Sequence, residues 1–524
     1  GIVAKEPAPF IYERLGENYR HFLVDEFQDT SVLQWMNLLP LLHNGLSGGH
    51  ESFVVGDAKQ AIYRFRSGEV EQFIRLPKIK GASENPLLRE REKCLEDNIG
   101  VDHLKYNYRS CREIVEFNNH LFGQLHDKLS GELKKVYADH KQEARREGGY
   151  VSVEIISESA DDPLPHLSRS LEIVQELIED GFMQGEIAIL VRSNNDGAEM
   201  ACFLMEQGIN VVSTDSLKLG SSQKAGCVIA LLRVLSDAAD AALRCAALTQ
   251  LEKAGLLKME LHEAVARCMA GNELKGFESL LAESDMPFCI SDLSSLPLTE
   301  QTESLIRLLG FARTPDPFLL GLLECVQEFS TRFNTGLHAF LDRWDSNYCK
   351  SNIALSASDD AVRVLTIHKA KGLEFPAVII PKASWVKNTG KDRKWVSYRD
   401  DNLKELNSIA ININKGLKET DFDAYFNEEL NLIELDNINL LYVACTRPSE
   451  RLYVISKKAV GNNISENIVP AIEKHPLWNK EAQRLLLGEK ARHAKQPDED
   501  KSDTEIAAMP SAPWQGRIHI AAGR

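Results

Sequence analysis

The stretch Val24-Asp25-Glu26-Phe27-Gln28-Asp29-Thr30 decides the fold, because it directly continues the apolar run His21-Phe22-Leu23-Val24. Two carboxylates, Asp25 and Glu26, therefore stand where a buried strand is expected to end. Open α/β sheets bind their ligands just beyond the carboxyl ends of their strands. Adjacent acids there suit a nucleotide site, because one can hold the shell of a magnesium ion while the other orients or deprotonates an attacking water. By itself the pattern also fits an ordinary solvated strand end.

Four further blocks follow in order along the chain. They are Gly56-Asp57-Ala58-Lys59-Gln60-Ala61-Ile62-Tyr63-Arg64-Phe65-Arg66 after the apolar run Phe53-Val54-Val55, then Tyr106-Asn107-Tyr108-Arg109-Ser110, Val364-Leu365-Thr366-Ile367-His368-Lys369-Ala370-Lys371-Gly372-Leu373-Glu374-Phe375-Pro376 and Leu441-Tyr442-Val443-Ala444-Cys445-Thr446-Arg447. Together the blocks resemble motifs II to VI of the superfamily 1 DNA helicases, the UvrD/RecB group, and their wording most resembles the RecB/AddA branch. The resemblance covers residues 10 to 457.

One element of such helicases is missing from the sequence. The class holds phosphates with a Gly-x-x-x-x-Gly-Lys-Ser/Thr loop. No Gly-Lys-Ser or Gly-Lys-Thr occurs in the 524 residues, and the one Gly-Lys, Gly390-Lys391, is followed by Asp392. The resemblance places the loop N-terminal to Asp25, which only twenty-four residues precede. We therefore expect a fragment that begins inside the first motor domain and has negligible ATPase activity of its own.

Composition indicates a large soluble protein of several domains. The chain has 524 residues, 43% of them hydrophobic, and no run of 18 apolar residues suggests a membrane span, so we expect a cytoplasmic protein without a membrane partner. Ten scattered cysteines without a Cys-x-x-Cys pair predict reduced thiols rather than a disulfide frame, a zinc site or an iron–sulfur cluster. The fourteen histidines show no metal-ligand spacing.

The charge is unevenly distributed. The net charge is −16, yet residues 361–394 hold eight Lys or Arg against two acids, a local net charge of +6. Phosphate binding usually leaves such a basic footprint, and we interpret this segment as a limited basic track for DNA. For Lys387 to Lys394, a solvated basic loop is the alternative.

Hydrophobic patterning predicts an α/β fold. Helical spacing occurs at 31–42 and 171–178, and strand patterns occur at 150–156, 187–191, 362–367, 377–380 and 451–455. From 216 to 354 the texture is helical. With the resemblance, this implies RecA-like (P-loop NTPase) motor domains with a helical insertion. Residues 1–100 would be the remainder of the first motor domain, 101–215 and 355–480 the second, 216–354 the insertion, and 481–524 a linker or tail toward a possible nuclease domain.

The resemblance implies catalytic roles. Asp25 would coordinate Mg²⁺, and Glu26 would be the base for water attack on the γ-phosphate of ATP. Gln60 would sense that phosphate, since its amide both donates and accepts. Arg109 and Arg447 would reach the γ-phosphate from the second motor domain, because a guanidinium is always charged and can fork onto phosphate oxygens. The structural alternatives are a surface salt bridge for Glu26 and a helix-start ion pair for Arg109.

Further residues are assigned to the nucleotide. Glu374 would accept hydrogen bonds from the ribose or otherwise support nucleotide binding. Gly372 would let the backbone approach closely at the preceding turn. Asp57 would lie with them at the nucleotide.

The resemblance also implies a DNA-binding set, namely Tyr63, Phe65, Arg66, Thr366, His368 and Lys369. The two aromatic faces would stack on single-stranded bases, with Arg66 linking back to the acidic block. Core packing is the alternative for one of the aromatics, and a buried imidazole satisfied by a carbonyl is the alternative for His368. Phe65 stands where repair-branch relatives carry Trp, and Pro448-Ser449 replaces the usual pair after Arg447.

The expected function is that of an ATP-dependent DNA helicase or translocase with ATP and Mg²⁺ as cofactors. The resemblance implies 3′-to-5′ movement along one DNA strand with duplex ahead, in double-strand-break repair and recombination. An AddB/RecC-like protein is also implied as the partner. A motor-dead scaffold that binds DNA or a partner, and a UvrD/Rep-like repair helicase, are the alternatives. Retention of Glu26, Gln60, Arg109 and Arg447 favours the enzyme, because a scaffold needs no γ-phosphate sensors.

Overall fold

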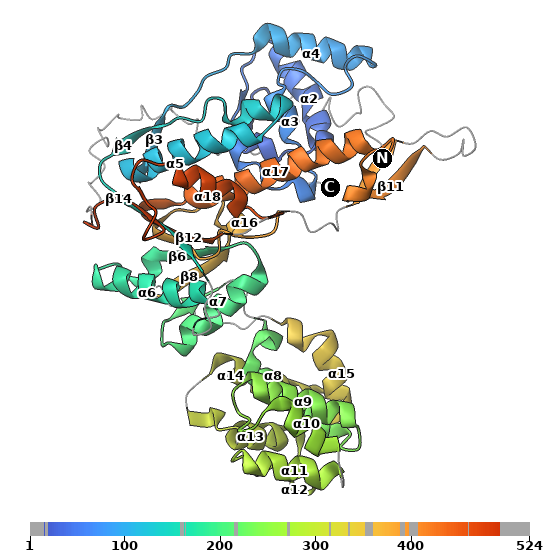
Figure 1. The fold of residues 1–524 in the computed structure, drawn as a ribbon. Helices are drawn as coiled ribbons and strands as arrows, with labels where there is room; N and C mark the ends of the chain where they lie inside the picture. The colour runs from blue at the N-terminus through green and yellow to red at the C-terminus, as the bar shows by residue number, and fades with distance from the viewer. Residues whose placement is uncertain are drawn as a thin grey trace, which may run out of the picture.

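The computed structural model describes residues 15, 19–157, 162, 164–213, 218–269, 273–313, 316–333, 336–351, 360–387, 393–397, 407–458 and 461–492. Within them the chain is mixed α/β, and Figure 1 shows helices on both sides of a large sheet with a separate group of helices below. The expected tail beyond residue 492 and the segment Gly390-Lys391-Asp392 lie outside the described residues.

The N-terminal part is built on two short parallel strands, β1 (Leu23–Val24) and β2 (Phe53–Val54). Between them runs α2 (Val32–Ser47), which confirms the predicted helix and extends it. The helix starts with a capping box, in which the Ser31 hydroxyl accepts from the Gln34 N–H and the Ser31 N–H donates to the Gln34 side chain. Two further helices complete this part, α3 (Val70–Ile74) and α4 (Pro86–Asn98).

An eight-stranded sheet forms the centre of the molecule, in the order β13-β14-β5-β12-β9-β6-β8-β7. Its strands are β5 (Tyr150–Ile156), β6 (Ile187–Val191), β7 (Val211–Val212), β8 (Val362–Thr366), β9 (Phe375–Ile380), β12 (Pro448–Lys457), β13 (Trp478–Asn479) and β14 (Arg484–Gly488). The six strands from β5 to β7 pair in parallel, and β13 and β14 are antiparallel. Every strand predicted between 150 and 455 lies in this sheet, although β12 and β9 separate β5 from β6.

Helices cover both faces of the sheet. On one face lie α5 (Arg112–Leu125), α17 (Asp423–Cys445) and α18 (Ser465–Glu473), and on the other lie α6 (Pro165–Glu179) and α7 (Asn194–Glu206) (Figure 1). Alternate strand residues divide between the two cores, so that Ala188 and Leu190 join one while Ile187 and Ile189 join the other. This explains the unbroken apolar run at 187–191, because a parallel sheet is buried on both sides.

Eight helices make up the separate helical group: α8 (Gln223–Ser236), α9 (Ala241–Lys253), α10 (Leu261–Met269), α11 (Glu273–Glu283), α12 (Ile290–Ser294), α13 (Leu298–Leu308), α14 (Pro317–Arg332) and α15 (Leu337–Ser346). The predicted helical texture is confirmed. The patterning that runs to Leu248 is divided between α8 and α9, and the Asp240 carboxylate caps the second of them by accepting from the Ala242 N–H.

Two small sheets were not predicted. The strands β3 (Tyr106–Cys111) and β4 (Glu143–Arg146) pair in parallel, and β10 (Arg393–Ser397) and β11 (Ser408–Asn412) pair antiparallel. All ten cysteines are free thiols, as predicted. Across the described ranges, every helix is too short or too polar to span a bilayer.

Candidate active site

The acidic block turns sharply where β1 ends. Glu26 has a φ of 51°, a left-handed conformation that is uncommon for a side chain other than Gly or Asn. Its N–H donates to the Asp25 carboxylate at 2.8 Å. Gln28, only 1% exposed, donates from its amide nitrogen to Glu26 and accepts the Asp57 N–H at 3.0 Å. One buried amide therefore ties the end of β1 to the end of β2.

The turn after β2 is organised by Asp57. Its carboxylate accepts the Lys59 N–H at 3.1 Å and pairs with the Lys59 ammonium at 2.7 Å. The Gln60 amide donates to the same carboxylate at 3.2 Å. Because β1 and β2 are parallel, Glu26 and Gln60 come to the same edge, as the sequence predicted for strand ends.

A lysine from the segment after β8 closes this edge. The Lys371 ammonium lies 3.2 Å from a Glu26 oxygen, donates to the Gln60 carbonyl at 2.9 Å and pairs with Asp29. Its side chain is only 6% exposed. Burial raises the pKa of Asp29 above its ordinary value, and the Lys371 charge opposes that shift.

This contact corrects the predicted role of Arg66. The link back to the acidic block is made by Lys371, whereas the Arg66 guanidinium lies 5.6 Å and 5.5 Å from the ring centres of Tyr63 and Phe65. Lys371 belongs to the conspicuous sequence block from Val364 to Pro376. Its partner could not be read from spacing, because the two lie more than three hundred residues apart.

The two predicted arginines lie side by side. Arg447 is 1% exposed and donates to the carbonyls of Val443 (2.9 Å) and Leu373 (3.2 Å). Arg109 donates to the Thr446 carbonyl at 3.3 Å and lies 3.4 Å from the exposed Glu374 carboxylate. In the part of the chain that the structure describes, no carboxylate forms an ion pair with Arg447.

The electrostatics at Arg447 show what surrounds it. Burial and, to a smaller extent, the neighbouring Arg109 charge lower its pKa to about 10, while Tyr442, Glu26 and Asp57 act in the opposite direction. Two guanidiniums thus lie next to each other, and Arg447 lies within reach of the Glu26 and Asp57 charges at the ends of β1 and β2. Such a pair of like charges favours an anion between them.

Gly372 adopts a backbone conformation that favours glycine. Its φ is +82°, and a Cβ added there would meet nothing within 4 Å. The turn therefore requires glycine for its backbone conformation, and no close approach by another part of the described chain explains it.

The predicted DNA-binding residues gather beside this edge. The Tyr63 hydroxyl donates to the His368 carbonyl at 2.9 Å, and the Phe65 and His368 rings meet edge to face at 5.4 Å. Phe65 is 68% exposed, whereas Tyr63 is half-buried. Thr366 is buried before α16 (Ile367–Ala370), and Lys369 is exposed on it.

Four of the eight basic residues in the segment 361–394 form ion pairs. Its lysines pair with acids from elsewhere in the chain, as in Lys371 with Asp29, Lys382 with Asp196, Lys387 with Glu434 and Lys394 with Glu428. The local charge of +6 therefore overstates the positive surface, because a count along the sequence omits partners brought in by folding.

One exposed aromatic was missed. Tyr108 is 69% exposed and directly precedes Arg109. An aromatic face next to a phosphate-binding guanidinium can stack on a nucleobase. The Tyr-x-Tyr-Arg pattern in the sequence was the signal.

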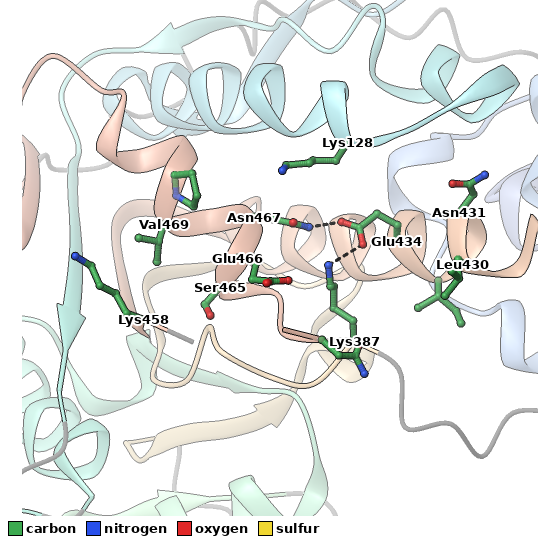
Figure 2. A pocket seen from close by; sticks show the side chains of 13 residues that line it. Lys128, Lys387, Leu430, Asn431, Glu434, Lys458, Ser465, Glu466, Asn467 and Val469 are labelled. Carbon is green, nitrogen blue, oxygen red and sulfur yellow. Dashed lines mark hydrogen bonds and ion pairs between the residues drawn. The ribbon is translucent and has the colours of Figure 1, made fainter. Parts of the chain in front are cut away.

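A cavity of about 740 Å³ lies apart from this site, between α17 and α18. Figure 2 shows Lys387 and Asn467 bound to Glu434 within it, with Lys128 and Lys458 at its sides. None of the predicted site residues lines this cavity.

Comparison with known families gives the identity of the fold. Residues 4–79 match the UvrD/REP helicase N-terminal domain, and residues 103–254 and 330–459 match the UvrD-like helicase C-terminal domain. The second match alone covers more than half of the chain. The chain belongs to the UvrD-like helicase family.

Relatives of this UvrD-like helicase chain are larger proteins. It is 27% identical over 86% of its length to an ATP-dependent helicase/nuclease subunit of Streptococcus pneumoniae (strain ATCC 700669 / Spain 23F-1), covering 41% of that protein. It is also 27% identical to the exonuclease/helicase subunit RexA of Streptococcus pneumoniae serotype 4, with the same coverage. The corresponding ATP-dependent helicase/nuclease protein of Oceanobacillus iheyensis is 24% identical, with 89% and 42% of the two chains covered. The predicted family resemblance is confirmed, and the chain spans about two fifths of these relatives.

Proposed function

We propose that this chain is the central and C-terminal motor part of an ATP-dependent DNA helicase or translocase. Residues 1–100 would be part of a first RecA-like motor domain, 101–215 and 355–480 the second, and 216–354 its helical insertion. One observation carries the proposal. Arg447 lies beside Arg109 and close enough to Glu26 and Asp57, which come from a different part of the chain, for their charges to act on its guanidinium.

The site fits ATP with Mg²⁺. The ion usually keeps several waters and is held by one or two carboxylates together with substrate phosphates. The exposed Asp25 can supply such a carboxylate. Bound Mg²⁺ would neutralise charge on the phosphates. Glu26 would accept the proton of the attacking water, and Gln60 would orient that water or the γ-phosphate.

Arg109 and Arg447 would stabilise the charge that develops as the γ-phosphate bond breaks. Arg447 is already desolvated, which strengthens its interaction with an anion. Glu374 and Gly372 would border the nucleotide from the same segment, and the exposed face of Tyr108 would stack on its base.

DNA would bind beside this edge. Phe65 presents most of its ring to solvent, which supports stacking on an unpaired base. Tyr63 would support it from beneath, with Arg66 against both rings. Thr366, His368 and Lys369 would meet the DNA backbone nearby.

For the whole protein we propose a RecB/AddA-like helicase–nuclease component of double-strand-break repair and recombination. Its relatives are named helicase/nuclease subunits, which supports a partner of the AddB/RecC kind. Movement would be 3′-to-5′ along single-stranded DNA, in the cytoplasm where bacterial DNA lies. A motor-dead scaffold or a UvrD/Rep-like repair helicase remains the alternative.

DNA-stimulated ATP hydrolysis tests the proposal in a longer protein that joins this chain to the first part of a UvrD-like motor. We expect Glu26→Gln to lower kcat by about 100-fold or more, the usual share of a general base. The matched control is Glu51→Gln, which alters an exposed acid beside β2. A complete protein that binds DNA but hydrolyses no ATP would support the scaffold.

A further inference from the structure

A fully buried amide joins α17 to the turn that carries Gln60. Asn439 is 0% exposed. Its amide nitrogen donates to the carbonyls of Ala58 at 3.0 Å and Ala61 at 2.9 Å, and its oxygen accepts from the Tyr137 hydroxyl at 2.9 Å. Both amide hydrogens therefore have acceptors, and the side chain bridges two segments more than three hundred residues apart.

The chemistry of the contact requires an amide. Only Asn and Gln side chains offer two donors and an acceptor in one plane. Tyr137 is itself 0% exposed, and burial raises its pKa well above the ordinary value, so its hydroxyl remains a donor. That donor fixes the amide oxygen on the Tyr137 side and directs the nitrogen of Asn439 at the turn.

The same helix leads to the proposed arginine. From Asn439, α17 continues to Cys445 and is followed by Thr446 and Arg447. At 1.5 Å per residue, the last residue of α17, Cys445, lies about 9 Å along the helix axis from Asn439, and Arg447 follows two residues later. One helix thus holds the Ala58–Gln60 turn at one point and carries the guanidinium at its end.

A second contact grips the segment just beyond the turn. The Arg64 guanidinium donates to Glu429 at 2.5 Å and to Asp436 at 2.6 Å, and both acids belong to α17. The Lys59 ammonium also lies 5.5 Å from the centre of the Tyr442 ring. The turn and the segment that follows it therefore contact α17 at several side chains.

We propose that Asn439 is a positioning residue that sets the spacing between Gln60 and Arg447. It reaches the nucleotide only through the turn that it holds. The contact brings the γ-phosphate sensor into register with the arginine when the two halves of the site come together. Its effect on hydrolysis rests on the proposed function, whereas the contact itself does not.

Hydrogen exchange of this chain without nucleotide tests the contact directly. The Gln60 and Ala61 N–H groups donate to Asp57 and Ala58 at 2.8 Å and 3.3 Å within the turn. We expect Asn439→Ala to accelerate their exchange about 10-fold, the effect of losing one or two net hydrogen bonds. Tyr137→Phe removes only the orienting hydroxyl and should act in the same direction to a smaller extent, which keeps the test available if Asn439→Ala does not fold.

Asn437→Ala is the matched control. Asn437 is also a buried amide of α17, but it accepts from the Trp385 ring N–H at 2.9 Å and donates to the Ile433 carbonyl at 2.7 Å. This substitution should leave the exchange rates of the Gln60 and Ala61 N–H groups unchanged. Equal acceleration by Asn437→Ala, or no acceleration by Asn439→Ala and Tyr137→Phe, overturns the proposal.

A kinetic test addresses the role in hydrolysis. In the longer protein, Asn439→Ala should lower kcat about 10-fold while the KM for ATP changes about 2-fold at most, because a sensor acts mainly in the transition state. A raised KM with unchanged kcat overturns the positioning role. Suppose that Asn439→Ala accelerates exchange of the turn amides but the unchanged longer protein hydrolyses no ATP. The contact is then upheld, whereas the proposed function and the role of Asn439 in hydrolysis are overturned.

Discussion

At the scale of single residues, His368 is a proton-sensitive member of the proposed DNA-binding set. Burial, reinforced by the Arg192 charge, lowers its pKa to about 4. In the unfolded chain a histidine has a pKa of about 6.5. The folded state therefore binds this proton less readily than the unfolded state, so the free energy of unfolding falls as the pH drops from about 6.5 toward 4.

His368→Gln should flatten that part of the pH dependence. Denaturant unfolding at pH 7 and pH 5 measures it, since the midpoint reports the change in stability. The exposed His262, changed to Gln, is the control and should leave the dependence as in the unchanged chain. The prediction would be contradicted if the unfolding midpoint changed equally between pH 7 and pH 5 in the unsubstituted protein and in His368→Gln.

The proximity of Glu26, Gln60 and Asp57 could be predicted from the sequence, because each follows an apolar strand and parallel strands end at one edge. The basic residue that pairs with the acidic block could not be predicted from the sequence. The resemblance implied Arg66, but the ion pair is made by Lys371, whose approach depends on how two distant segments pack.

At the scale of elements, α17 holds the segment after β2 through an ion-paired arginine. Arg64→Met should destabilise the fold by about 1–2 kcal/mol, because it leaves the buried Glu429 without one partner. Lys394 remains 3.4 Å from Glu429, which limits the loss. Adding Glu429→Gln should recover part of it, since of the two acids that Arg64 binds only Asp436 then keeps a carboxylate without this arginine.

A double-mutant cycle from thermal unfolding measures this coupling. Effects of Arg64→Met and Glu429→Gln that simply add would show that the two side chains do not support each other. Arg332→Met, which removes an exposed pair with Glu328 on α14, is the control and should change stability by less than about 1 kcal/mol.

Elements with one clear texture could be predicted. The strands at 150–156 and 187–191 have the predicted bounds, since apolar residues alternate with polar ones at Val151–Ile155 and the second strand is apolar throughout. The helix α17 was not predicted, and its pattern explains why. Its residues from Asn437 to Cys445 are all buried, so no polar stripe marks the helical period. The pair β10 and β11 is short, and its packed apolar side chains are few, namely Val396, Ile409 and Ile411.

At the scale of the whole molecule, the helical group interrupts the segments that build the sheet. The change in texture near residue 216 predicted it, because helical spacing replaces strand patterns there. Its two ends lie together in the structure. The Leu219 N–H donates to the Ser351 carbonyl at 3.0 Å, and a Cβ on Gly220 would lie within 3.2 Å of Cys349. Termini in contact are typical of an inserted unit that could be removed without stretching its host.

Residues 218–351 expressed alone should therefore fold. The segment has its own fully buried side chains, among them Leu231, Leu248 and Phe340, and Figure 1 shows its helices as a body of their own. We expect a helical circular-dichroism spectrum and one cooperative thermal transition, because a core of this size satisfies a single domain. The remaining chain, closed by a short Gly-Ser linker, should keep its sheet, since joining ends that already touch costs little loop entropy. A non-cooperative melt of the excised segment would show that its core depends on the sheet.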